Sequence, residues 1–133
     1  MKRLLIRDQV TFAGWLEGDA KLASYRTAQI FCLPSHYEAF GIAALEAMFA
    51  GLPVVGTRVG GFADLVEHGR SGLLVAPSNP AELANALRAL LDDAALAAGM
   101  GKHGRHRAFE HFSSDAIVEG YVDVYWRTMR EEA

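Results

Sequence analysis

Short runs of consecutive apolar residues alternate along this chain with longer stretches in which apolar residues recur every three or four positions. The short runs are rich in β-branched residues and predict strands, whereas the periodic stretches predict helices. The expected strands cover residues 10–13, 30–33, 53–57 and 73–75. The expected helices cover residues 19–29, 42–50, 62–67, 80–91, 94–109 and 114–130.

This alternation predicts an α/β fold. We expect a Rossmann-like, doubly wound parallel sheet of about four strands, with helices on both faces and further helices at the C-terminus. The strand at 30–33 is apolar throughout, which is typical of a strand covered on both faces, so we expect Cys32 to be an inert core residue. Ligands of such sheets bind beyond the carboxyl ends of the strands, which directs attention to residues 14–15, 34–41, 57–62 and 75–78.

Composition narrows the class of protein. The 133 residues are 51% hydrophobic and 22% charged, which indicates one globular domain and excludes disorder and collagen-like repeats. No apolar run is long enough to span a membrane, and the stretch at 4–6 is too short for a signal peptide. The lone cysteine excludes a disulfide framework and favours the cytoplasm. The net charge is −3, so the chain lacks the strongly basic surface that is typical of nucleic-acid-binding proteins.

Candidate chemistry is concentrated at residues 33–48. A strand ends there, and a loop places the carboxylate of Glu38 at the rim of the sheet. Gly41 then opens a helix, and the amides of Gly41, Ile42 and Ala43 lack partners within that helix, so they can bind an anion such as phosphate. Glu46 follows among apolar neighbours, where an unpaired carboxylate is costly to bury. It must reach solvent or accept hydrogen bonds from a ligand.

A carboxylate accepts two hydrogen bonds at once and suits vicinal hydroxyls. These residues therefore suggest a nucleotide sugar, with Glu46 on a ribose, the helix start on a diphosphate and Glu38 on the sugar. The alternative is that Glu46 is ordinary surface charge and Glu38 only an acidic residue near a helix start. From the residues alone, both interpretations remain open, because a single helix start after a strand is a weak signal.

Glu38 and Glu46, with seven residues between them that include Phe40-Gly41, resemble the signature of the family 4 (group 1) glycosyltransferases, in which the second glutamate opens Glu-Ala-Met. Seven further segments resemble family motifs in the same order, so the resemblance extends from about residue 10 to residue 125. These segments are 10–14, 51–57, 59–61, 64–66, 72–77, 100–105 and 112–113.

The resemblance implies the C-terminal, donor-binding half of a GT-B fold and transfer of a sugar from a nucleotide-activated donor with retention, without a metal or another cofactor. By position, Glu38 would be the catalytic residue that contacts the donor sugar, and Glu46 would bind the ribose. The remaining carried-over donor-binding residues are Phe40, Gly41, Ile42 and Ala43 at the sugar and diphosphate, Gly14, Trp15 and Leu16 at the base, and Gly60 and Gly61 at the sugar end.

The chain also departs from the family pattern. Nothing in residues 1–9 matches the arginine and lysine that clamp the diphosphate, although Lys2, Arg3 and Arg7 supply charge. The acceptor domain has no counterpart. We therefore expect residues 1–133 to form one N-terminally truncated donor domain, inactive without an N-terminal acceptor domain and able to self-associate through exposed apolar surface. A non-catalytic nucleotide-sugar-binding or interaction domain is the alternative.

Other residues fit plainer interpretations. His36 lies beside the candidate site, although a loop histidine is usually just solvated. His103 and His106 have metal-ligand spacing, but a solvated basic face explains them better; that face could also meet anionic lipid, giving peripheral membrane contact. Tyr121 and Trp126 belong to the core or to an apolar face left partly exposed. A retaining glycosidase requires closer carboxylates than this spacing offers.

Overall fold

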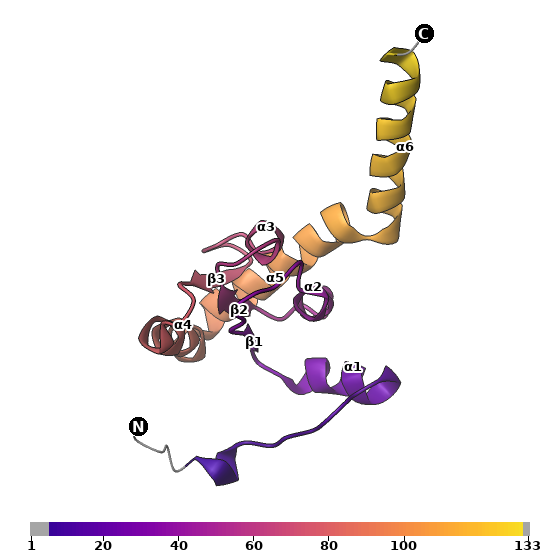
Figure 1. The fold of residues 1–133 in the computed structure, drawn as a ribbon. Coiled ribbons are helices and arrows are strands. Elements are labelled where there is room, and N and C mark those ends of the chain that lie inside the picture. Colours follow the sequence, from indigo (N-terminus) through magenta and orange to yellow (C-terminus); the bar gives the residue numbers. More distant parts are fainter. Residues whose placement is uncertain (1–5, 132–133) are drawn as a thin grey trace.

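Three parallel strands form the centre of the molecule (Figure 1). The computed structural model describes residues 6–131 of the chain. The sheet has the order β1 (Phe31–Leu33), β2 (Val54–Thr57) and β3 (Gly72–Val75). Both neighbouring pairs are parallel, so all three carboxyl ends point toward the same edge of the sheet.

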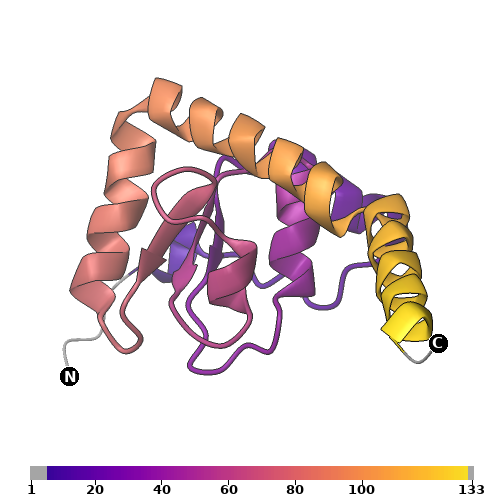
Figure 2. The same cartoon turned by 90° about the horizontal axis from the view of Figure 1, so that it is seen from above.

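Helices cover both faces of this sheet and extend beyond it (Figures 1 and 2). The two faces are separate because neighbouring residues of a strand point to opposite sides. The helical elements are the 3₁₀ helix η1 (Arg7–Gln9), α1 (Gly18–Thr27), α2 (Ile42–Phe49), α3 (Phe62–Leu65), α4 (Pro80–Asp92), α5 (Ala94–Phe112) and α6 (Ser114–Glu131). Val54 belongs to a core cluster with residues of α2 and α3, and Val55 belongs to another with Leu90 of α4.

Helix α5 crosses the amino ends of the strands, at the edge of the sheet opposite the loop that carries Glu38. Gly101 lies so close to Gly51 that a Cβ on it would stand 2.1 Å from the Gly51 carbonyl oxygen. A Cβ on Gly104 would stand 3.3 Å from the Ser71 carbonyl oxygen. Glycine at these positions therefore allows the helix to pack directly on the turns that precede β2 and β3.

The predicted α/β class is confirmed, with three strands among the described residues, and the helix bounds differ by a few residues from those expected. The strand expected at 10–13 is wrong, since that segment is exposed and unpaired with the sheet. A strand requires a neighbour for its backbone N–H and C=O groups, and no described strand lies beside these residues.

The prediction that Cys32 is buried is also wrong, because its side chain is exposed. Strand β1 is an edge of the described sheet, and Cys32 pairs in register with Val55. Helix α4 packs on β2 and β3 over the Val55 face, and it leaves the same face of β1 less covered. An apolar run alone does not reveal which strand will be the edge.

Helix α6 leaves the body of the molecule at an angle and carries apolar side chains into solvent (Figure 1). Ile117, Val118 and Tyr121 are all exposed, Tyr121 at 75%. Partial exposure of this face is therefore confirmed, whereas a core position for Tyr121 is not. The side chain of Trp126 lies outside the described residues. Within residues 6–131, no helix has the length and hydropathy needed to cross a bilayer.

Candidate functional site

The start of α2 is shaped by Gly41. Its backbone is left-handed, with φ of +92°, and a Cβ would stand 2.7 Å from the ring of buried Phe62. Glycine is therefore required both for the turn and for the close approach. The Gly41 carbonyl accepts from the amides of Ala44 and Leu45 at 2.9 and 3.0 Å. The amides of Ile42 and Ala43 precede these bonds in the first turn, where helices bind anions.

The loop that carries Glu38 packs backbone to backbone on the turn at residues 59–61. The Gly61 amide donates to the Ala39 carbonyl at 3.1 Å. A Cβ on Gly60 would stand 2.1 Å from the Glu38 carbonyl oxygen, and a Cβ on Gly61 would stand 2.3 Å from that of Ala39. The structure therefore brings Gly60 and Gly61 against the half-buried Glu38. The same loop continues directly into the start of α2, so the turn, the loop and the helix start lie together.

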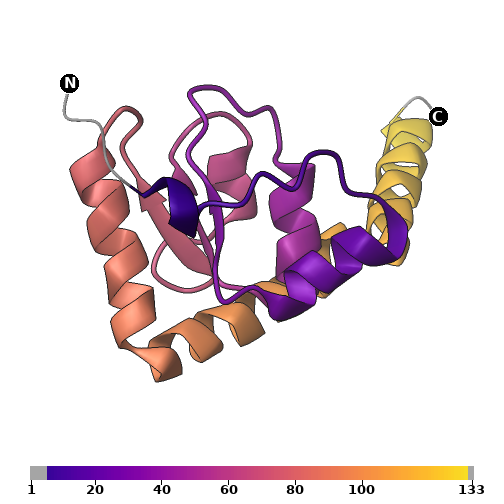
Figure 3. The ribbon, with the colours of Figure 1, turned by 90° about the horizontal axis from the view of Figure 1, so that it is seen from below.

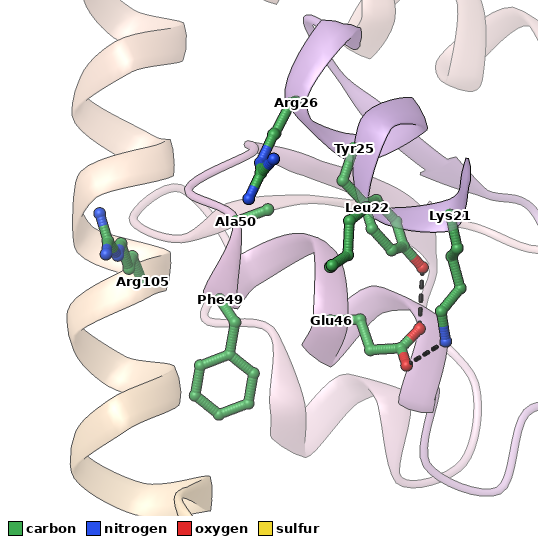
Figure 4. A pocket seen from close by; sticks show the side chains of 8 residues that line it. All are labelled: Lys21, Leu22, Tyr25, Arg26, Glu46, Phe49, Ala50 and Arg105. Carbon is green, nitrogen blue, oxygen red and sulfur yellow. Dashed lines mark hydrogen bonds and ion pairs between the residues drawn. The ribbon is translucent and has the colours of Figure 1, made fainter. Parts of the chain in front are cut away.

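Glu46, on α2, accepts hydrogen bonds from two side chains of α1. Lys21 Nζ lies 2.7 Å from Oε1, and the Tyr25 hydroxyl lies 3.0 Å from Oε2 (Figure 4). The hydrogen bond from Lys21 lowers the pKa of the Glu46 carboxyl, against the effect of burial. Burial and the hydrogen bond to Glu46 raise the pKa of Tyr25 to about 12. Glu46 is thus an ionised acceptor held by protein donors, an arrangement that the sequence did not reveal.

An open cavity of about 410 Å³ surrounds these groups, between α1, α2 and α5 (Figure 4). Figure 3, the view from below, shows α1 running across one end of α2. Of the residues carried over from the family pattern, Glu46 is the one that lines this cavity in the described part of the chain. The lining residues are Lys21, Leu22, Tyr25, Arg26, Glu46, Phe49, Ala50 and Arg105.

A smaller cavity of about 160 Å³ lies at the carboxyl ends of all three strands. Three of the four loops expected there contribute to it, through His36, Thr57 and Ser78 among others. Thr57 donates to the Ser35 carbonyl, and the Ser78 hydroxyl lies 3.4 Å from His36 Nδ1. Asn79 caps α4 by accepting from the Glu82 amide at 3.1 Å, as expected for an asparagine before proline at a helix start.

The segment of Gly14, Trp15 and Leu16 lies apart from both cavities. Trp15 is 88% exposed, and its indole nitrogen donates to the carboxylate of Glu17 at 2.7 Å. None of the three residues lines either cavity. Their predicted contact with a nucleotide base remains a prediction.

The C-terminal histidines pair with carboxylates. His103 Nε2 lies 3.1 Å from Glu67, which also accepts from Arg70 at 2.7 Å. His106 lies 3.3 Å from Glu110. The hydrogen bonds from His103 and Arg70 lower the pKa of Glu67. Within residues 6–131, no three His, Cys, Asp or Glu side chains are grouped to hold a metal ion.

A family model described as "Glycosyl transferases group 1" matches residues 1–107. N-acetyl-alpha-D-glucosaminyl L-malate synthase of Bacillus anthracis is 35% identical over 132 residues, which are 99% of this chain and 34% of that protein. D-inositol 3-phosphate glycosyltransferase of Streptomyces avermitilis is 40% identical over 129 residues, 96% of this chain and 27% of that protein. The chain spans about a third of the length of such relatives.

Solved structures also superpose on this chain. Sucrose-phosphate synthase from Thermosynechococcus elongatus superposes with a TM-score of 0.84 at 36% identity, covering 95% of this chain and 32% of that one. HepE of Anabaena, solved in complex with UDP and glucose, superposes with a TM-score of 0.81 at 26% identity, covering 92% of this chain and 33% of that one.

Proposed function

The chain belongs to the group 1 glycosyltransferase family, and on that basis we propose that it binds a nucleotide-diphosphate sugar as the C-terminal, donor-binding part of a retaining transferase. The observation that carries the proposal is the junction of the Glu38 loop, the start of α2 and the Gly60-Gly61 turn. These three elements place a carboxylate beside free helix-start amides at one edge of the sheet.

In this proposal the amides of Ile42 and Ala43, with Gly41 and Phe40 beside them, receive the diphosphate and the sugar. The positive end of the α2 dipole favours the charge that develops on the leaving diphosphate. Glu38 is the catalytic residue and supports positive charge near the anomeric carbon. In retaining transfer of this kind the leaving phosphate oxygen takes the acceptor's proton on the same face, so no side-chain nucleophile is used. Transfer without a metal ion remains a prediction.

Glu46 receives the ribose in this proposal, and its existing partners are compatible with that role. A carboxylate has about four lone-pair positions, and Lys21 and Tyr25 use two of them. Two ribose hydroxyls can therefore bind without displacing either side chain. Lys21 and Tyr25 then act as positioning residues that fix the carboxylate. Gly14, Trp15 and Leu16 would meet the base from the segment that precedes α1.

Transfer by this chain alone is not expected, because it spans about a third of its relatives' length. We propose that an acceptor-binding N-terminal domain completes the enzyme and that the exposed apolar face of α6 also permits self-association. A cytoplasmic location, with peripheral membrane contact through the basic face of α5, is the expected setting. A non-catalytic nucleotide-sugar-binding or interaction domain is the second candidate, favoured by the lack of a match to the family's diphosphate clamp in residues 1–9.

Calorimetric titration of the chain with UDP and UDP-glucose tests the donor site. Saturable binding is expected, weakened about tenfold or more in Glu46→Ala, since a charged acceptor of two hydrogen bonds is lost. Glu119→Ala removes an exposed carboxylate from α6 and is the matched control. Absence of saturable binding, or equal affinity in all three proteins, would contradict the proposal. Robust sugar transfer by the chain alone would contradict the need for a second domain.

A further inference from the structure

The cavity beside Glu46 holds two arginines that the donor site does not use. Arg26 comes from α1 and Arg105 from α5, and both guanidinium groups flank the same space beside Ala50 and Phe49 (Figure 4). In the part of the chain that the structure describes, neither group has a carboxylate partner. Two like charges that face one cavity repel each other, so their placement calls for an anion.

The charges of the cavity leave a positive excess. Three cationic side chains and one carboxylate line it, and that carboxylate, Glu46, is already bonded to Lys21 and Tyr25. Glu110, the acidic residue in the neighbouring groove, lies 3.3 Å from His106 and 3.6 Å from His111. The two arginines therefore leave the cavity with an excess of two positive charges, although the chain as a whole carries a net charge of −3.

Simpler reasons do not account for both arginines. Arg26 lies in the last turn of α1, where a cation favours the helix dipole. Arg105 lies in the middle of α5, where no such benefit exists. The Arg105 guanidinium is 5.7 Å from the centroid of the Phe109 ring, and that ring packs edge-to-face on Phe49. These contacts hold the Arg105 side chain at the cavity before any ligand arrives.

We propose that Arg26 and Arg105 form an anion site for the phosphoryl group of a phosphomonoester, separate from the donor diphosphate. Guanidinium groups bind phosphate oxygens in a bidentate manner, and Leu22, Phe49 and Ala50 offer apolar wall to the organic part. A volume of about 410 Å³ suits a small phosphorylated molecule. Ala50 lies eight positions after Ile42 along α2, so this end of the cavity lies roughly 12 Å from the helix start.

The test is a titration of the chain with inorganic phosphate and with phenyl phosphate, followed by the arginine side-chain NMR signals. Saturable shifts are expected, and the affinity falls about tenfold or more in Arg26→Gln and in Arg105→Gln because charge-assisted hydrogen bonds are lost. Arg88→Gln removes an exposed arginine of α4 outside the cavities described and is the matched control. Both cavity arginines are exposed, and a thermal melt of each variant checks that its fold is unchanged.

A second arm separates free phosphates from lipid headgroups. The chain is sedimented with phosphatidylcholine vesicles that contain or lack phosphatidic acid. If the phosphoryl group belongs to a lipid, the parent chain binds the vesicles with phosphatidic acid and the two cavity variants do not. The site is overturned if neither soluble phosphate nor these vesicles show saturable binding, or if Arg88→Gln weakens binding as much as the cavity variants. It is also overturned as a separate site if the cavity variants lose UDP affinity to the same extent as phosphate affinity.

Discussion

The two glutamates of the candidate site stand in regions that are built in different ways. The Glu38 loop is fixed by backbone contacts to Gly60 and Gly61 and by buried Phe62 beneath Gly41. Glu46 is held by side chains of α1, a helix with no buried residues. Backbone packing tolerates no added methyl group, whereas a side-chain hydrogen bond can be exchanged for a ligand's. The first region is therefore rigid by construction, and the second is adjustable.

The largest effect is expected at the buried aromatic ring that supports the first region. Phe62→Ala removes a fully buried ring, and a loss of about 3–5 kcal/mol in the free energy of unfolding is expected. Phe12→Ala, at a ring that is 92% exposed, should change it little. Urea denaturation measures both. If Phe62→Ala loses less than about 1 kcal/mol, well below the range for a buried ring, the ring does not support the site.

A glycine substitution tests the close approach itself. Gly61→Ala places a methyl group 2.3 Å from a backbone oxygen and should cost about 1–3 kcal/mol of unfolding free energy, through overpacking. Gly99→Ala has nothing within 4 Å and lies in α5, so it should stabilise the helix by up to about 1 kcal/mol. Thermal denaturation compares them. Equal melting temperatures would mean that the loop and the turn do not touch.

The adjustable region should respond more weakly. Tyr25→Phe removes the hydroxyl that donates to Glu46 and should cost about 0.5–1.5 kcal/mol of unfolding free energy. Thr27→Val, which removes a hydroxyl bonded within α1 itself, provides a control on the same helix. If Tyr25→Phe costs as much as Gly61→Ala, the contrast between the two regions fails.

The smallest effect is on the acid limb of stability. Lys21 lowers the pKa of Glu46 in the folded state, so the pair contributes stability above the ordinary pKa of a glutamate, near 4.3, and this contribution disappears as pH falls through the lower folded value. Glu46→Gln should therefore be less stable than the parent near pH 6, and the difference should shrink as pH falls below the ordinary pKa of a glutamate. Melting curves across this range measure the difference. A gap that widens as pH falls would contradict the assigned direction.

The parts of the site that were predictable from sequence are those fixed by short, local patterns. Gly41 after a strand marks the start of a helix, and Gly60-Gly61 after the next strand marks a turn. The close approach between that turn and the Glu38 loop was not predicted. Lys21 and Tyr25 were not anticipated as partners of Glu46, because their spacing places them on one face of α1 without saying which helix that face meets. Arg26 and Arg105 were missed for the same reason, since they meet only in the fold.

The two errors in the fold share one cause. Residues 10–13 and Cys32 both have the apolar, β-branched surroundings of buried strands. Whether such a segment pairs, and whether its faces are covered, depends on neighbours elsewhere in the chain. Strand β1 is an edge of the described sheet, so no strand pairs with residues 10–13 beside it. The same edge position leaves Cys32 exposed.

The most direct test of donor binding is an amide NMR titration of the chain with UDP. Binding at the start of α2 predicts the largest shifts at Ile42, Ala43 and Glu46, which meet the diphosphate and the ribose. Smaller shifts are expected at Gly60, at the sugar end, and none at Gly99 of α5, which has no neighbour within 4 Å. Shifts of equal size at Gly99 and Ile42, or no shifts at saturating nucleotide, would contradict the account that this chain holds the donor at the start of α2.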